Sequence, residues 1–347
     1  MLRRSHRGAI FTNAAVFSAD WVPADFHSRD GELDTMATAL EPILEHEPAS
    51  GLFLSGPTGT GKTSSSQHLL GRLQGHTGEL HTATVNCWSN HSRYRVLYRI
   101  VEEIKGRAVT THDHAASALQ DTLRTVDAPT VVVLDEADQL DEPEVIYDLY
   151  EEPSLAVVVT ANTKSDVLVG LDERIQSRLR TFIDVEFDPY TAGELTPILE
   201  QRARHGLQPG VIETDLLGDI ARAANGNARD AIAALEGAAQ QAVEDGAERI
   251  ESDHVTTAVA SASQDVRKET LKRLNDHQRE IYELVAAAGP LSPRTIYAHY
   301  REQMADPRSQ RTVRKYVRKL AQYDLLTATG AAQSRKYQLV EDAPQPE

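Results

Sequence analysis

The most constraining feature of the sequence is GPTGTGKT at residues 56–63, which fits the pattern G-x-x-x-x-G-K-[ST]. The strand-like run GLFLS precedes it and a helical pattern follows it. Gly56, Gly59 and Gly61 allow the backbone to curl so that its N–H groups face a phosphate, and the N-terminus of the next helix adds a positive dipole end. The segment therefore predicts a phosphate-binding loop between a strand and a helix.

The side chains of this loop predict which nucleotide groups it binds. Lys62 is placed to reach the β and γ phosphates of ATP or ADP, and Thr63 is placed to put its hydroxyl on Mg²⁺. The predicted nucleotide-binding residues of the loop are Gly56, Pro57, Thr58, Gly59, Thr60, Gly61, Lys62, Thr63 and Ser64.

Two further apolar runs end in polar side chains. The run VVVLDEAD (131–138) predicts a buried strand, with Asp135 in the magnesium shell and Glu136 orienting the attacking water. AVVVTAN ends in Asn162, whose amide is placed to contact the γ phosphate or the water. A solvated acidic turn and a turn-forming asparagine are the structural alternatives. Their order after the phosphate loop favours a site that hydrolyses the nucleotide.

Strand-like and helical patterns alternate through the first half of the chain, which predicts an α/β domain with a parallel sheet. From residue 191 an Ala-rich, helical pattern replaces the strands. The predicted strands lie at 51–55, 82–86, 130–134, 155–160 and 181–186, and the helices between them lie near 62–74, 92–105, 113–126 and 143–150. The predicted organisation is an extended segment over 1–30, the α/β domain over 31–188, a helical domain over 189–263, a C-terminal module over 264–340 and a disordered tail over 341–347.

The charge of the chain is strongly uneven. Its 52 acidic and 36 basic residues give a net charge of −16, yet residues 266–340 carry 15 basic and 7 acidic side chains. A basic segment on an acidic chain indicates a polyanionic partner, although a solvated charged face is the simpler explanation for most charge clusters. Lysine is scarce, at 8 residues against 28 arginines, and an acidic, lysine-poor surface suits a salt-rich cytosol.

The composition also excludes some classes of protein. Cys87 is the single cysteine, so no intrachain disulfide can form, as is typical of a reducing cytosol. No apolar run reaches about 18 residues, and the sequence therefore predicts no membrane partner. We expect a cytoplasmic protein that associates with the nucleoid.

The segment RSQRTVRKYVRKL (308–320) predicts an amphipathic, strongly basic helix. Val313, Tyr316, Val317 and Leu320 recur at helical spacing and predict one buried stripe. An earlier helix begins after Ser292, and a strand pair follows, so the order predicts a winged helix-turn-helix. A winged helix that docks on protein is the alternative. The predicted DNA-contacting residues are Arg294, Arg308, Arg311, Arg314, Lys315, Arg318, Lys319, Arg335 and Lys336.

Taken together, these motifs resemble the archaeal ORC/Cdc replication initiators, the origin recognition complex and cell division control family. The resemblance runs from about Phe11 to Leu339. It is carried by DWVPADFHSRDGEL (20–33), GPTGTGKT, VVVLDEAD, the arginines of LDERIQSRL (171–179), FDPYTAGEL (187–195), GNARDAI and the basic C-terminal segment. It implies an AAA+ P-loop NTPase fold with a parallel sheet, a helical lid domain and a C-terminal winged-helix domain.

The resemblance also implies roles for individual residues. Asn162 corresponds to sensor 1, and Arg229, at the start of a lid helix, corresponds to sensor 2. Either Arg178 or Arg174 would be the arginine finger that acts on the ATP of a neighbouring subunit, so a lone subunit would hydrolyse ATP slowly. The positions implied to contact the nucleotide from outside the loop are Val22, Pro23, Tyr190 and Arg202.

The function implied by the resemblance is an ATP-switched initiator that binds double-stranded origin DNA and works with a replicative helicase or other initiator subunits. Two other classes fit the same motifs. One is an AAA+ DNA motor of the branch-migration helicase type, which would form a closed hexamer. The other is a non-catalytic adaptor that keeps ADP bound.

Overall fold

The computed structural model describes residues 8–18, 21–23, 26–76, 79–106, 115–169, 171–330, 334–340 and 343, with the side chains of residues 76, 263, 265 and 269 left aside. The chain divides into two units. One is Asp20–Tyr190, and the other combines Met1–Ala19 with Thr191–Glu347. Among the described residues, no helix is long and apolar enough to cross a membrane.

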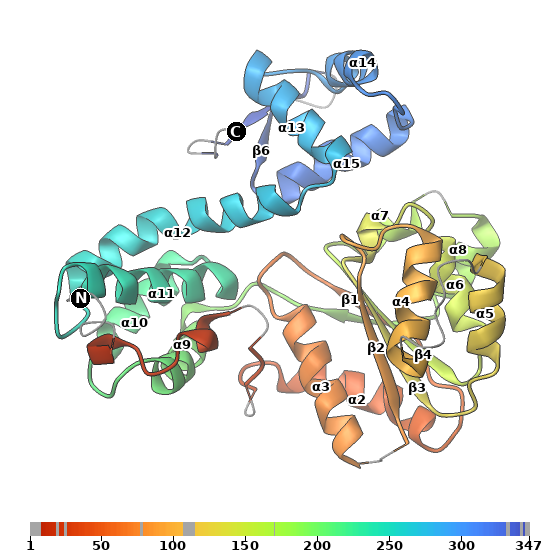
Figure 1. Ribbon diagram of the computed structural model, residues 1–347, viewed down its shortest axis with the longest axis horizontal. Helices are drawn as coiled ribbons and strands as arrows, with labels where there is room; N and C mark the ends of the chain where they lie inside the picture. Colours follow the sequence, from red (N-terminus) through yellow and green to blue (C-terminus); the bar gives the residue numbers. More distant parts are fainter. Residues whose placement is uncertain are drawn as a thin grey trace. The chain divides into compact units, whose positions relative to one another are not determined.

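The first unit is built on a sheet of five parallel strands, as the alternating pattern predicts (Figure 1). Its spatial order is β2-β3-β4-β1-β5, so the chain crosses between strands that are not adjacent in sequence. The strands are β1 (Leu52–Ser55), β2 (His81–Asn86), β3 (Thr130–Asp135), β4 (Leu155–Ala161) and β5 (Ile183–Glu186), which confirms all five predicted strands.

Helices cover both faces of this sheet, because its central strands are apolar on both sides. Every residue of β3 and β4 is buried. Val131 and Val133 pack with α2 (Asp30–Leu44) and α3 (Lys62–His76). Val132 and Leu134 face the other core. That core is formed with α4 (Arg93–Lys105), α5 (Ala116–Arg124), α6 (Glu144–Tyr150), α7 (Lys164–Leu168) and α8 (Glu173–Leu179).

The second unit begins with a short N-terminal segment that packs on the lid helices. Thr12 and Asn13 donate their backbone N–H groups to the carbonyl of Gly206, at 2.9 and 3.1 Å. The prediction that residues 1–30 are extended is wrong over η1 (Ala14–Phe17), a 3-10 helix, because the Asn13 side chain caps it by accepting from Ala15 N–H. The lid helices are α9 (Ala192–Gly206), α10 (Thr214–Ala223), α11 (Ala228–Glu244) and α12 (Ser252–Arg273).

Helix α12 differs from the predicted boundary between the helical domain and the basic module. It runs unbroken from Ser252 to Arg273 and so crosses the boundary that the sequence predicts between residues 263 and 264. No glycine or proline interrupts the stretch from Ser252 to Arg273, so nothing in the local chemistry ends the helix earlier.

The C-terminal part of the second unit has the three helices and the strand pair of a winged helix. These elements are α13 (Asp276–Ala288), α14 (Pro293–Gln303), α15 (Gln310–Gln322), β6 (Leu326–Thr329) and β7 (Lys336–Leu339). Asn275, Ser292 and Ser309 cap the three helices with their side chains. β6 and β7 pair antiparallel, and Leu291 adds a bridge to Tyr337. Of the predicted tail, only Ala343 is among the described residues.

Candidate nucleotide and nucleic-acid sites

The phosphate loop has the curled backbone that its glycines predict. Gly56, Gly59 and Gly61 have φ values of +146°, +77° and +94°, a range that side chains other than glycine rarely adopt. The space is equally restricted. A Cβ at Gly56 would lie 2.2 Å from the carbonyl oxygen of Phe187, and one at Gly61 would lie 2.4 Å from Tyr190 Oη. Both conformation and packing therefore require glycine at these two ends of the loop.

The Lys62 side chain folds back into the loop that precedes it. Its Nζ donates to the carbonyls of Gly56 and Pro57, both at 2.7 Å, and the residue is only 9% exposed. Thr60 Oγ1 donates to the same Pro57 carbonyl at 2.9 Å. The ammonium group thus lies inside the curl at the N-terminus of α3, where helix dipole and charge both favour an anion. Thr58 and Ser64 are half-buried beside it.

Asp135 and Thr63 come together at the carboxyl end of β3. Thr63 Oγ1 donates to the two carboxylate oxygens of Asp135, at 2.9 and 3.1 Å. Hydroxyl and carboxylate oxygens are the ligand types that Mg²⁺ takes in proteins, so this pair fits the ion that a nucleotide phosphate would bring. Glu136 follows in the left-handed region, with φ 56° and ψ 43°, which turns the chain sharply away from the strand.

Thr160 on β4, which the sequence motifs do not single out, contacts the Asp135 carboxylate and the backbone of Glu136. Its hydroxyl donates to Asp135 Oδ1 at 2.5 Å and accepts from the backbone N–H of Glu136 at 3.0 Å. The residue is 1% exposed. The signal in the sequence was a lone hydroxyl within the apolar run, two residues before Asn162 and thus on the same face of the strand. Asn162 itself accepts from Gly56 N–H through its backbone carbonyl, at 3.1 Å, which joins the end of β4 to the phosphate loop.

Replacing Thr160 by valine, which has nearly the same shape, is expected to lower Mg²⁺-dependent ATP turnover about 10- to 100-fold. Asp135 would lose one donor, and the partly buried N–H of Glu136 would lose its acceptor. Turnover and ATP affinity should be measured with Mg²⁺ and with EDTA. Thr160→Ser keeps the hydroxyl and is expected to have the turnover and the ATP affinity of the wild type. A valine variant with unchanged turnover and unchanged Mg²⁺ dependence would contradict this role.

Tyr190 lies against the phosphate loop, whereas no such contact with the loop is described for Val22 and Pro23. Tyr190 is 5% exposed, and its hydroxyl approaches Gly61 as described above. Val22 and Pro23 are half-buried in an irregular segment of the same unit. The structure thus brings Tyr190 to the loop and leaves the nucleotide contacts of Val22 and Pro23 as predictions.

Arg202 is buried in the lid unit beneath the N-terminal segment. Its guanidinium donates to the carbonyls of Val16 and Ser18, the latter at 3.3 Å, and the residue is 7% exposed. Burial lowers the pKa of Arg202 to about 10, so it stays charged at neutral pH. Arg202 therefore has a clear structural partner, and its predicted contact with nucleotide stays a prediction.

The other predicted arginines are exposed. Arg174 and Arg178 lie on α8, and among the described residues neither side chain forms an ion pair. Arg229 lies in the first turn of α11, where the Asn227 side chain accepts from its backbone N–H at 2.9 Å. Burial raises the pKa of the next residue, Asp230, to about 6, although the charge of Arg229 opposes the shift. All three side chains are accessible to a phosphate, and their roles stay predictions.

The basic helix α15 has the buried stripe that its spacing predicts. Val313, Tyr316, Val317 and Leu320 are between 1% and 5% exposed. Arg311, Arg314 and Arg318 are exposed on the same helix, and Lys315 is half-buried. Outside the helix, Arg294, Arg335 and Lys336 are exposed as well. Most of the predicted DNA-contacting side chains are therefore accessible.

Two of the predicted DNA-contacting residues have other surroundings. Lys319 is 4% exposed, with Nζ 4.7 Å from the centre of the Tyr323 ring, so the prediction that it lies on the exposed basic face is wrong. Arg308 is half-buried, and its Nε donates to His277 Nε2 at 3.2 Å. Its backbone N–H also donates to Tyr300 Oη, at 3.0 Å. Arg308 thus fixes the turn between α14 and α15.

Known proteins and structures resemble the chain along almost its whole length. Residues 45–173 match the AAA domain family, and residues 196–260 match the Cdc6 AAA+ ATPase-type lid domain. The ORC1-type DNA replication protein 9 of Halobacterium salinarum is 40% identical over 332 residues, which cover 95% of this chain and 94% of that protein.

Solved structures agree with these matches. The Aeropyrum pernix ORC1 protein in complex with DNA has a TM-score of 0.74 at 26% identity, covering 97% of this chain and 94% of the other. The Aeropyrum pernix ORC2 protein, solved as ADPNP–ADP complexes, has a TM-score of 0.66 at 21% identity, covering 96% of this chain and 95% of the other. At this identity the likeness shows a shared fold and no more. The chain belongs to the ORC1-type DNA replication initiator family and has its AAA+ ATPase domain.

Proposed function

We propose that this protein recognises origin DNA, uses ATP binding and hydrolysis as a switch, and assists in recruiting a replicative helicase. The observation that carries the proposal is the set of exposed arginines on α15, namely Arg311, Arg314 and Arg318. The sheet domain of the same chain has a phosphate loop with Asp135 and Glu136 beside it. The DNA complex of the similar Aeropyrum pernix ORC1 protein supports the DNA-binding part.

The nucleotide site has a role for each polar group. Lys62 would bind the β and γ phosphates, and Thr63 and Asp135 would hold Mg²⁺, which supplies charge stabilisation to the transferred phosphate. Glu136 would orient the attacking water, and Asn162 would contact the water or the γ phosphate. Arg229 would act from the lid. Val22, Pro23, Tyr190 and Arg202 would complete the pocket.

The exposed arginines on α8 support a second part of the proposal. A neighbouring subunit would supply Arg178 or Arg174 to the ATP site, since an arginine given in trans raises turnover by about 10³–10⁵ in other NTPases. A lone subunit would then turn over slowly. Turnover per subunit that rises with protein concentration would show that a neighbour supplies the arginine. The variant that loses this rise, Arg174→Ala or Arg178→Ala, would identify the finger.

The test of the whole function is a binding selection on duplex fragments of the source genome, with ATP and with ADP. We expect a small set of duplexes to be retained, with affinities that differ between the two nucleotides. Equal retention of all fragments in both states would overturn origin recognition. A closed hexamer with fast, DNA-stimulated turnover would instead indicate a motor, and permanently bound ADP without turnover would indicate an adaptor.

A further inference from the structure

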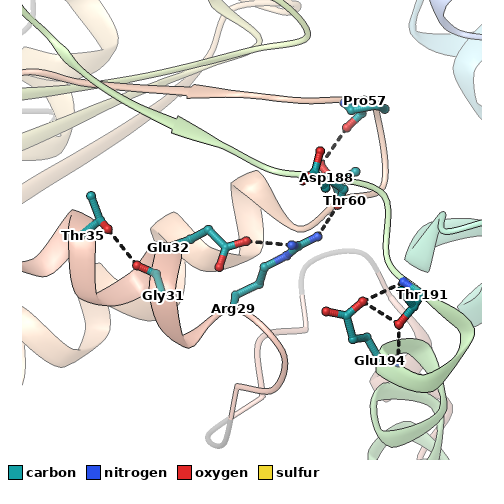
Figure 2. A network of polar contacts seen from close by, with 9 residues as sticks. All are labelled: Arg29, Gly31, Glu32, Thr35, Pro57, Thr60, Asp188, Thr191 and Glu194. Atoms are coloured by element: carbon teal, nitrogen blue, oxygen red, sulfur yellow. Dashed lines mark hydrogen bonds and ion pairs between the residues drawn. The ribbon is translucent and has the colours of Figure 1, made fainter.

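Arg29 is a buried cation at the start of α2, within the motif DWVPADFHSRDGEL, and none of the roles assigned above uses it. It is 5% exposed, and its guanidinium forms two polar contacts that Figure 2 shows. One Nη donates to Glu32 Oε1 at 2.7 Å, and the other donates to the backbone carbonyl of Asp188 at 2.6 Å. Its Nε has no hydrogen-bond partner among the described residues. The contact with Asp188 links two segments that lie 159 residues apart in the sequence.

The guanidinium also lies over two aromatic rings of the segment that follows β5. Its carbon is 4.0 Å from the centre of the Tyr190 ring and 5.3 Å from that of Phe187. Cation–π attraction is stronger where water is excluded, as it is at this buried site. Arginine suits this position because its planar group can face a ring while its N–H groups donate in a fork, a geometry that the compact ammonium group of lysine does not reproduce. Arg29 therefore contacts the segment at two points, the Asp188 carbonyl and the Tyr190 ring.

The segment Phe187–Tyr190 contacts the phosphate loop at both ends. Phe187 N–H donates to Ser55 O at 2.7 Å, and the Phe187 carbonyl fills the space that a Cβ at Gly56 would need. The Tyr190 hydroxyl fills the equivalent space at Gly61. This segment also leads directly into Thr191, the N-cap of lid helix α9. It is thus both a wall of the phosphate loop and the start of the connection to the lid.

We propose that Arg29 is a positioning residue for nucleotide binding, acting through Tyr190 on Gly61 of the phosphate loop. Arg29 is not one of the residues of the phosphate loop (56–63). Its guanidinium lies over the Tyr190 ring, and the hydroxyl at the far end of that ring then sets the space above Gly61. The inference rests on the proposed nucleotide site, since it concerns the shape of that site.

The first experiment compares Arg29→Met and Arg29→Lys with the wild type in titrations of a fluorescent ATP analogue. Methionine keeps the length of the side chain without its charge, and lysine keeps the charge without the flat, forked group. We expect both variants to bind the analogue about tenfold more weakly, which is about 1.4 kcal/mol. Lysine with full affinity would overturn the requirement for a stacked guanidinium.

The second experiment separates positioning from general stability. Arg93→Met is the matched control, because Arg93 also joins two elements of this unit, bonding to Asp148 and Gln120 at 2.8 Å each. Both methionine variants are expected to lower the melting temperature of the nucleotide-free protein. Only Arg29→Met is expected to reduce the additional rise that ATP causes. An equal ATP-induced rise in the two variants would show that Arg29 serves stability alone.

A double-mutant cycle tests the route through Tyr190. If Arg29 acts through that ring, Arg29→Met should weaken ATP binding no further in a Tyr190→Ala background. Fully additive losses would overturn the route. A wild-type protein that binds no ATP would refute the proposed function instead, whereas normal ATP binding by Arg29→Met would refute only the role of Arg29.

Discussion

Replacing Lys62 by alanine is expected to abolish measurable ATP binding at nucleotide concentrations that saturate the wild type. The buried ammonium lies inside the curled loop, where it donates to the Gly56 and Pro57 carbonyls. Bound phosphates would take over these bonds as charge-assisted ones, each contributing about 1.5–3 kcal/mol. Losing two of them corresponds to a loss of affinity of roughly 10²- to 10⁴-fold. Titration calorimetry with Mg-ATP measures this loss of affinity directly.

The matched control for this variant is Lys105→Ala. Lys105 is an exposed lysine at the end of α4 in the same unit, so its loss changes the net charge by the same amount without touching the loop. We expect that control to bind ATP as the wild type does. An unchanged ATP affinity in Lys62→Ala, with a normal melting temperature, would refute the assignment of the phosphate loop.

The second large effect is expected for the double variant Arg311→Ala with Arg314→Ala, which should bind duplex DNA at least about tenfold more weakly at low salt. Both arginines are exposed on α15, and each phosphate contact releases a counterion. With Lys319 buried, five basic side chains of residues 308–319 remain. If all five contact phosphates, log K should fall with log salt at a slope of about −4.5 in the wild type. The double variant should show a slope flatter by about 2.

Binding is best followed by fluorescence anisotropy over a salt series. The matched control is Arg273→Ala with Arg301→Ala, because these arginines are also exposed in the same unit but lie outside α15. The control removes the same number of positive charges, so it separates a local contact from net charge. Equal losses in the two double variants would argue against α15 as the DNA-contacting helix, and an unaltered affinity in both would favour a winged helix that docks on protein.

Much of the fold was predictable because its signals are local. All five strands were located within a few residues, since buried parallel strands are continuous apolar runs between turn signals. The glycines of the phosphate loop and the stripe on α15 depend on backbone geometry and helical spacing, which a short segment specifies by itself. The family resemblance rests on the same short motifs, and the relatives confirm it.

The tertiary structure decided which polar side chains meet, because those contacts join residues that are distant in the sequence. Thr160 bonds to Asp135 across 25 residues, Arg29 to Asp188 across 159, and Arg202 to Val16 across 186. The charge of Lys319 predicts an exposed side chain, yet the packing of α15 buries its stem and places its ammonium over Tyr323. Hydrophobic patterning therefore determined the strands and the stripe on α15, and the glycine pattern determined the phosphate loop, while the partners of buried charges followed only from how the elements pack.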